Sequence, residues 1–136
     1  YIARAYKAKG NYYESDIWYL RAIAEAPYLR EPYVEAAQNA YEESKWEKVY
    51  YLLTEVLKIT TRPLTYINEE YCWGSLPYDL LSIAAYNLGL YEKALAYSKK
   101  ASELSPDDNR IKENIKIIEQ AKISLAHSNS IIPQNS

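Results

Sequence analysis

The spacing of three aromatic residues constrains the fold of this chain more than any other feature. Tyr12, Trp46 and Tyr91 each follow a short helix-breaking turn, and the first two lie 34 residues apart. The interval from Trp46 to Tyr91 is 45 residues, which corresponds to the same period with an insertion of 11. A fixed period of this length is typical of arrays in which each unit buries its apolar face against its neighbours.

This period divides the chain into parts with different expected roles. The 136 residues, 49% of them hydrophobic, suffice for one domain with a buried core. The chain begins with Tyr and contains no Met, so we expect it to be part of a longer protein. We expect an array over residues 1–125, with units at 1–29, 30–63 and 75–108, an insert at 64–74, a capping helix at 108–125 and a flexible tail at 126–136.

Small residues recur at matching positions of the units, and they indicate closely packed helices. Ala3, Ala37, Ala94 and Ala101 would let helix axes approach to about 8–10 Å while large aromatic side chains fill the holes opposite them. The chain has three glycines and is rich in Ala, Leu, Glu and Lys, which are good helix formers. The sequence therefore predicts an all-α fold of antiparallel helix pairs.

The predicted turns carry residues that end one helix and begin the next. Gly10 and Gly89 can adopt the left-handed conformation that closes a helix. Ser44, with Glu47 three residues later, has the spacing of a capping box, in which each side chain bonds to a backbone amide of the other residue. We therefore expect each pair of helices to be joined by a short local turn.

These residues resemble the tetratricopeptide family, whose pattern W-x2-L-G-x2-Y, A-x3-F and P extends over 34 residues. The second unit departs from the pattern with Val49 in place of a small residue and Thr61 in place of proline. The resemblance implies a right-handed α-α superhelix of about three helical hairpins followed by a capping helix. The third unit is the best match, with Tyr78, Leu81, Ser82, Ala85, Gly89, Tyr91, Ala94, Ala101 and Pro106.

The capping helix is expected to bury one narrow stripe. Asp107 and Asp108 can cap its N-terminus, and Ile111, Ile115 and Ile118 recur at helical spacing with charged residues between them. Residues 126–136 are polar apart from two isoleucines, so we expect this tail to lack regular structure.

The insert suggests a narrower resemblance. Residues 64–74, together with residues 30–37 and 76–95, are similar to the repeat region that lies C-terminal to the catalytic domain in bacterial family-two glycosyltransferases. In that family a D-x-D motif in the catalytic domain binds the metal. This chain has no pair of aspartates with that spacing, so we expect it to be non-catalytic; its aspartates are Asp16, Asp79, Asp107 and Asp108.

Other site chemistries find little support. The single cysteine, Cys72, and the single histidine, His127, cannot supply the usual ligands of a metal site. The three glycines are isolated, so there is no phosphate-binding loop, and adjacent carboxylates at Glu69 and Glu70 rarely face one site. We therefore expect no catalytic residues, no metal and no cofactor.

Charge and cysteine content limit the classes of partner. The net charge is −2 with 16 basic and 18 acidic residues interspersed, so no global field favours nucleic acid or an anionic membrane. No stretch approaches the roughly 20 apolar residues of a membrane span. A single cysteine suits a reducing compartment, and we expect a cytoplasmic protein. Proteins or peptides are the expected partners, and self-association is left open.

In tetratricopeptide proteins the first helix of each unit lines a concave groove, so the resemblance implies where a partner binds. Most aromatic residues fall at core spacing, but Trp18 and Trp73 do not; we expect Trp73 to attach the insert to the third unit and treat it as a secondary surface. The surface lacks the clustered Lys, Arg and Asn that would bind a terminal carboxylate. The predicted groove residues are Arg4, Lys7, Gln38, Tyr41, Glu42, Ile83, Tyr86 and Asn87.

Two functions remain after this reasoning. The first is an interaction module that forms the C-terminal part of a glycosyltransferase and binds a protein or peptide in its groove. The second is an adaptor with no enzymatic parent. The residues upstream of Tyr1 would distinguish them, because only the first requires a catalytic domain there.

Overall fold

The computed structural model describes residues 11–62 and 70–131, with side chains described as far as residue 128. The described ranges contain helices and no strand, which confirms the predicted all-α fold. Residues 1–10, the first helix of the first predicted unit, lie outside the described residues. The elements are α2 (Tyr12–Glu25), α3 (Arg30–Glu42), α4 (Trp46–Lys58), the 3-10 helix η1 (Glu70–Cys72), α5 (Leu76–Asn87), α6 (Tyr91–Leu104) and α7 (Asn109–Ile131).

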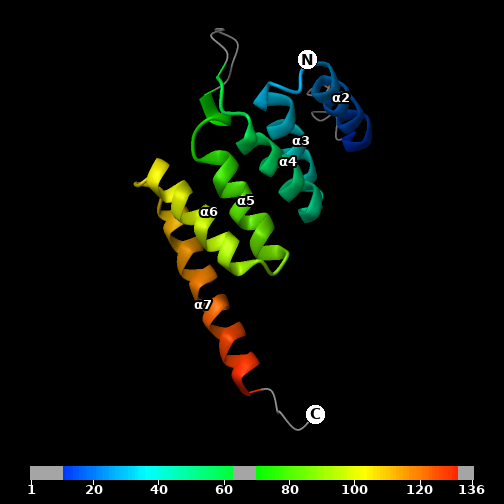
Figure 1. Cartoon of the computed structure of the whole chain (residues 1–136). Helices are drawn as coiled ribbons and strands as arrows, with labels where there is room; N and C mark the ends of the chain where they lie inside the picture. The colour runs from blue at the N-terminus through cyan, green and yellow to red at the C-terminus, as the bar shows by residue number, and fades with distance from the viewer. Residues whose placement is uncertain (1–10, 63–69, 132–136) are drawn as a thin grey trace.

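Each helix packs against the helix that precedes it, as expected for an array of repeats. Contacts join α2 to α3, α3 to α4, α4 to α5, α5 to α6 and α6 to α7. Figure 1 shows α3 and α4 as one hairpin, α5 and α6 as the next, and α7 running along α6. The 3-10 helix lies between the two hairpins and contacts α3 and α5.

The two hairpins close with the same backbone motif. In the second, Gly89 has φ +78°, its amide donates to Tyr86 O at 3.1 Å, and the Leu90 amide donates to Ala85 O at 2.8 Å. This is a Schellman motif with the left-handed glycine that the sequence predicts.

In the first hairpin Ser44 occupies the equivalent position, with φ +57°. Its amide donates to Tyr41 O at 3.0 Å, and the Lys45 amide donates to Ala40 O at 2.9 Å. The predicted capping box is therefore wrong, because Ser44 ends α3 and the N-cap of α4 is Lys45, without a side-chain cap bond. A capping residue needs an extended backbone, which Ser44 does not have.

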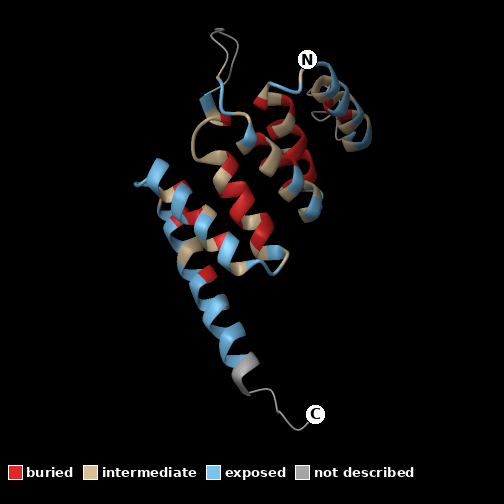
Figure 2. Ribbon diagram, viewed as in Figure 1, coloured by how far each residue is buried: buried red, intermediate tan, exposed pale blue. Residues whose placement is uncertain are grey.

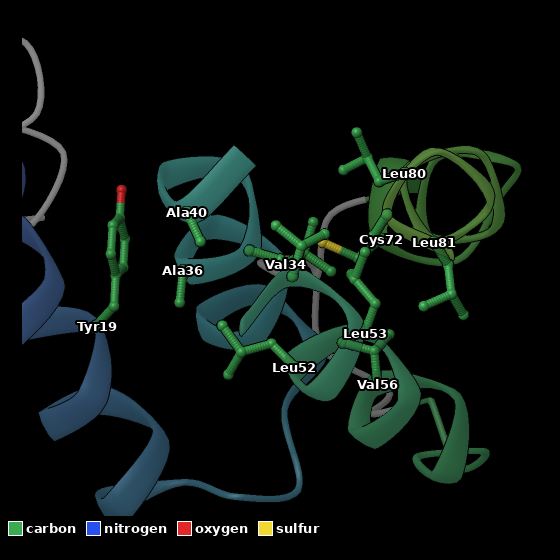
Figure 3. Packing of buried hydrophobic residues seen from close by; sticks show 13 residues of the cluster. Tyr19, Val34, Ala36, Ala40, Leu52, Leu53, Val56, Cys72, Leu80 and Leu81 are labelled. Carbon is green, nitrogen blue, oxygen red and sulfur yellow. The ribbon is translucent and has the colours of Figure 1, made fainter. Parts of the chain in front are cut away.

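The main core lies between α2, α3, α4 and α5 (Figure 2). Figure 3 shows the ring of Tyr19 facing Ala36 and Ala40 of α3, so a large side chain fills the space that small residues leave. Cys72 of η1 is fully buried beside Val34. The insert thus contributes a side chain to the core that joins the two hairpins.

A second cluster joins α5 and α6 to α7. Ala85, Ala94 and Ile118 are buried in it, and Ile111 of α7 is 1% exposed. This confirms the predicted apolar stripe of the capping helix. The helix is longer than predicted, however: it begins at Asn109 and continues past residue 125 to Ile131, beyond the end of the α5–α6 hairpin (Figure 1). The sequence from Asn109 to Ile131 contains no Gly or Pro, so no residue in this range interrupts the helix.

Candidate partner-binding groove

A hollow of about 350 Å³ lies where α3, α5 and α7 meet. Tyr41 of α3, the last turns of α5 and one face of α7 contribute to its lining. The hollow, called the groove below, is lined by Tyr41, Ile83, Tyr86, Asn87, Arg110, Asn114, Ile117 and Ile118.

Four of the eight predicted site residues line this groove. Tyr41 packs edge-on against Trp46, with ring centroids 5.3 Å apart and an interplanar angle of 84°. Tyr86 packs against Tyr91 with centroids 5.5 Å apart. Both tyrosines are half-buried and contact the two core clusters, so these rings also contribute to the fold.

The end of α5 is held by its own side chain. Asn87 Nδ2 donates to Ile83 O at 2.8 Å, which satisfies a carbonyl near the helix terminus. Asn87 is exposed and lines the groove, and an amide oxygen can accept a hydrogen bond. The α5 part of the lining therefore offers an isoleucine, a phenol and an amide.

Two of the other predicted residues, Gln38 and Glu42, are described and do not line the groove. The phenol of Tyr12 donates a hydrogen bond to Glu42, and this bond with the charge of the carboxylate raises the pKa of Tyr12. Glu42 therefore faces the start of α2. Gln38 is half-buried on α3 and is not part of the groove lining. Arg4 and Lys7 lie outside the described residues.

Half of the groove lining comes from α7, which the sequence reasoning treated only as a capping helix. Arg110, Asn114 and Ile117 recur at a spacing of four and three residues, so they share one face of α7. That face lies beside the buried stripe of Ile111 and Ile118. This face could have been identified from the helical spacing. Residues next to the buried stripe of a helix lie beside the surface on which the helix packs.

Arg110 is held in place by a buried carboxylate. Its Nη2 donates to Asp79 of α5, whose side chain is 8% exposed, and lies 4.0 Å from Asp108. The hydrogen bond with Asp79 raises the pKa of Arg110, so the guanidinium stays charged. The Arg110 side chain remains 55% exposed. This ion pair fixes α7 to α5 and places a cation at the side of the groove.

Trp73, predicted as a secondary surface, is half-buried and stacks with an arginine of the second unit. Arg30, at the start of α3, lies over the Trp73 ring with its Cζ 3.9 Å from the centroid, and Arg62 approaches to 5.6 Å. Arg30 also donates from Nε to Ile59 O at 2.9 Å and from Nη1 to Cys72 O at 3.0 Å. Burial lowers the pKa of Arg30. The prediction that Trp73 attaches the insert to the third unit was incomplete, because its stacking partner belongs to the second.

The described part of the chain shows neither a cluster of metal ligands nor a helix that could span a membrane. Within residues 11–62 and 70–131, no three His, Cys, Asp or Glu side chains gather as a metal site would require. None of the described helices is both long and apolar enough to cross a membrane.

Comparison with solved structures identifies the fold. The structure is similar to the first TPR domain of the human RPAP3 protein, determined by NMR, with a TM-score of 0.74. The match covers 93% of this chain and 91% of that domain at 17% sequence identity. No family model and no curated protein matches the chain. The chain therefore has the fold of a tetratricopeptide domain, and this likeness establishes the fold alone.

Proposed function

We propose that this chain is a protein-interaction module that binds a peptide segment of a partner protein in the groove between α3, α5 and α7. The observation that supports the proposal most is the lining of the groove. Ile83, Ile117 and Ile118 form an apolar surface, and Asn87, Asn114 and Arg110 place polar groups around it. Apolar surfaces with a few positioned polar groups are typical of ligand sites.

Ile117 is the side chain best suited to test the groove. It is 51% exposed and lines the groove, so a lysine there would place a charge in the groove with little cost to the core. Ile123 provides a matched control, because it lies on the same helix, is 62% exposed and is not part of the groove lining. Tyr41 and Tyr86 are poorer probes, because truncation of either ring would also disturb a core cluster.

The experiment is a selection from a phage-displayed peptide library against the unmodified chain. Selected peptides should lose binding to the Ile117→Lys variant by about tenfold or more and retain binding to Ile123→Lys, because a handful of buried contacts carries most of the energy of such interfaces. Peptides that bind both variants equally well would show that the groove is not the site.

We further propose that the module belongs to a bacterial glycosyltransferase as a non-catalytic C-terminal region. The basis is the resemblance of residues 30–37 and of the insert. In the structure these two segments are in contact, since Arg30 bonds to Cys72 and stacks on Trp73. An adaptor without an enzymatic parent is the alternative. The gene sequence upstream of Tyr1 decides, because further 34-residue units without a D-x-D-bearing domain would contradict the glycosyltransferase proposal.

A further inference from the structure

The exposed face of α2 carries an apolar stripe. Tyr13, Ile17 and Leu20 are 75%, 38% and 47% exposed. Ala24 is exposed as well. Successive intervals of four, three and four residues place these four side chains on one narrow face of the helix. Tyr19, which is 1% exposed, points to the core from another face. α2 therefore packs into the array through one apolar face and presents a second one, called the α2 stripe below, to solvent.

The other units show that the repeat does not require this stripe. Alignment on the three repeat aromatics gives the equivalent positions in the second helices of the other units, and most of them are polar. They are Glu47, Tyr51, Thr54 and Lys58 in α4, and Glu92, Ala96, Lys99 and Glu103 in α6. The four positions in α6 are all exposed, although both α5 and α7 pack against that helix. A helix that precedes α2 in the array would therefore leave the α2 stripe uncovered.

The spacing of the α2 stripe is that of a seam between two helices. In a heptad repeat the apolar a and d positions alternate at intervals of three and four residues, and their side chains pack into the holes of a second helix. Tyr13 and Leu20 occupy d positions of α2. Ile17 and Ala24 occupy its a positions. In an antiparallel pair of α2 helices, Ile17 would face Leu20 of the second copy. Tyr13 would face Ala24, so the largest side chain of the stripe would meet the smallest.

Two charged residues beside the stripe are complementary in the same arrangement. Glu14 and Arg21 are seven residues apart, so they lie along the same edge of the stripe. Arg21 lies over the Trp18 ring, with its Cζ 4.8 Å from the centroid. Among the described residues, neither Glu14 nor Arg21 forms an ion pair. In the antiparallel pair each Glu14 lies beside Arg21 of the other copy. A parallel pair would instead place Arg21 beside Asp16, which Lys48 already binds.

We propose that the chain associates with a second copy through α2, with the two helices antiparallel about a twofold axis. The two stripes form an apolar seam, and two Glu14–Arg21 pairs flank it along one edge. A seam of two heptads is short, so the dissociation constant should be on the order of 10–100 µM, as in small, transient interfaces. α2 lies at the N-terminal end of the array (Figure 1) and does not line the groove, so this surface is separate from the proposed peptide site.

Sedimentation equilibrium of the full chain between about 5 and 500 µM measures this association. The mean mass should rise from that of a monomer towards that of a dimer as the concentration increases. Ile17→Lys places a charge in the seam and should leave the chain monomeric throughout. Ala96→Lys is the matched control, because it introduces the same charge at the equivalent exposed position of α6. This control should associate as the unmodified chain does.

Charge reversal tests the antiparallel arrangement. Glu14→Arg or Arg21→Glu alone would place like charges beside each other twice along the seam, and each should weaken association by about tenfold. An equimolar mixture of the two variants restores opposite charges in both pairs, so it should associate within about threefold of the unmodified chain. Circular dichroism melting shows whether each variant is folded.

Several outcomes would overturn the proposal. A constant monomer mass over the whole concentration range would refute self-association. Association that survives Ile17→Lys, or that Ala96→Lys weakens equally, would show that the seam lies elsewhere. A mixture of the two charge variants that associates no better than either variant alone would refute the antiparallel pairing. Ile17→Lys should still bind the peptides selected for the groove, so failure of this proposal is distinguishable from failure of the groove function.

Discussion

Replacement of Arg30 by alanine tests how the insert is joined to the repeats. Arg30 is 8% exposed and makes three interactions with two separate parts of the chain. Its guanidinium donates to Ile59 O at the end of α4 and to Cys72 O in η1, and it stacks on Trp73. The variant Arg30→Ala removes all three interactions and leaves the core residues in place.

The cost follows from the bonds that are lost. Two hydrogen bonds from a charged donor contribute about 1.5–3 kcal/mol each, and stacking on a desolvated indole adds about 1–2 kcal/mol. Burial of the guanidinium opposes them by several kcal/mol, and this penalty disappears in the variant. We therefore expect a net loss of about 2–4 kcal/mol, which lowers Tm by about 10 °C in a domain of this length.

Urea unfolding followed by circular dichroism measures this loss. Arg62→Ala is the matched control. Arg62 approaches the same ring but only to 5.6 Å, and its ion pair with Glu70 involves a carboxylate side chain that is 89% exposed. Exposed pairs contribute about 0–1 kcal/mol, so this control should change stability little.

An equal loss of stability in the two arginine variants would refute the role assigned to Arg30. An Arg30→Ala variant that unfolds with the same midpoint as the unmodified chain would also refute it. The variant Arg30→Lys refines the test, because one ammonium group cannot reproduce the planar fork that bonds to two carbonyls and stacks on a ring. A lysine variant as stable as the original would mean that charge alone, and not this geometry, matters at the site.

Three further changes follow from the packing. Ala94→Trp should cost about 1–3 kcal/mol by overpacking between α5 and α7, and an unchanged melting curve would contradict the repeat register. Burial, and after it Tyr50, raises the pKa of Tyr97, so its neutral phenol contributes stability that is complete below about pH 10 and is lost as pH rises through the raised pKa. Tyr97→Phe should therefore reduce the alkaline loss of stability in urea unfolding at several pH values. Ending the chain after Gln120 should cost under about 1 kcal/mol, because residues 122–128 are exposed. Ending it before Asn109 removes the two buried isoleucines of α7, Ile111 and Ile118, and loses about 1.5–3 kcal/mol of burial for each.

The sequence predicts the helices well because their signals are local and repeated. The turn at Gly89 illustrates this: the glycine has the positive φ that its position requires, and α6 begins two residues later. Ser44 was misinterpreted because serine favours both helix starts and turns, so its type alone does not decide between the N-cap of α4 and the end of α3. The period could have decided, since Ser44 precedes Trp46 by the same two residues as Gly89 precedes Tyr91.

The groove could be predicted only in part, because its second side depends on tertiary packing. The repeat pattern placed Tyr41, Ile83, Tyr86 and Asn87 on a common face, and the structure brings them into one hollow. It could not place Arg110, because the contact of this residue with Asp79 arises only when α7 packs against the α5–α6 hairpin. That pair joins residues 31 positions apart, and no local pattern reveals it.

The docking of α7 therefore couples stability to the proposed binding. The same helix buries Ile118 against Ala85 and Ala94, and presents Ile117 to the groove one position away. Any change that loosens the buried stripe will also widen the groove, so loss of binding alone does not identify a contact residue. An exposed position such as Ile117, compared with Ile123 on the same helix, separates the two effects because neither side chain holds α7 to the core. This is why tests of the groove must rest on the exposed side of α7 and not on the tyrosines that first indicated the site.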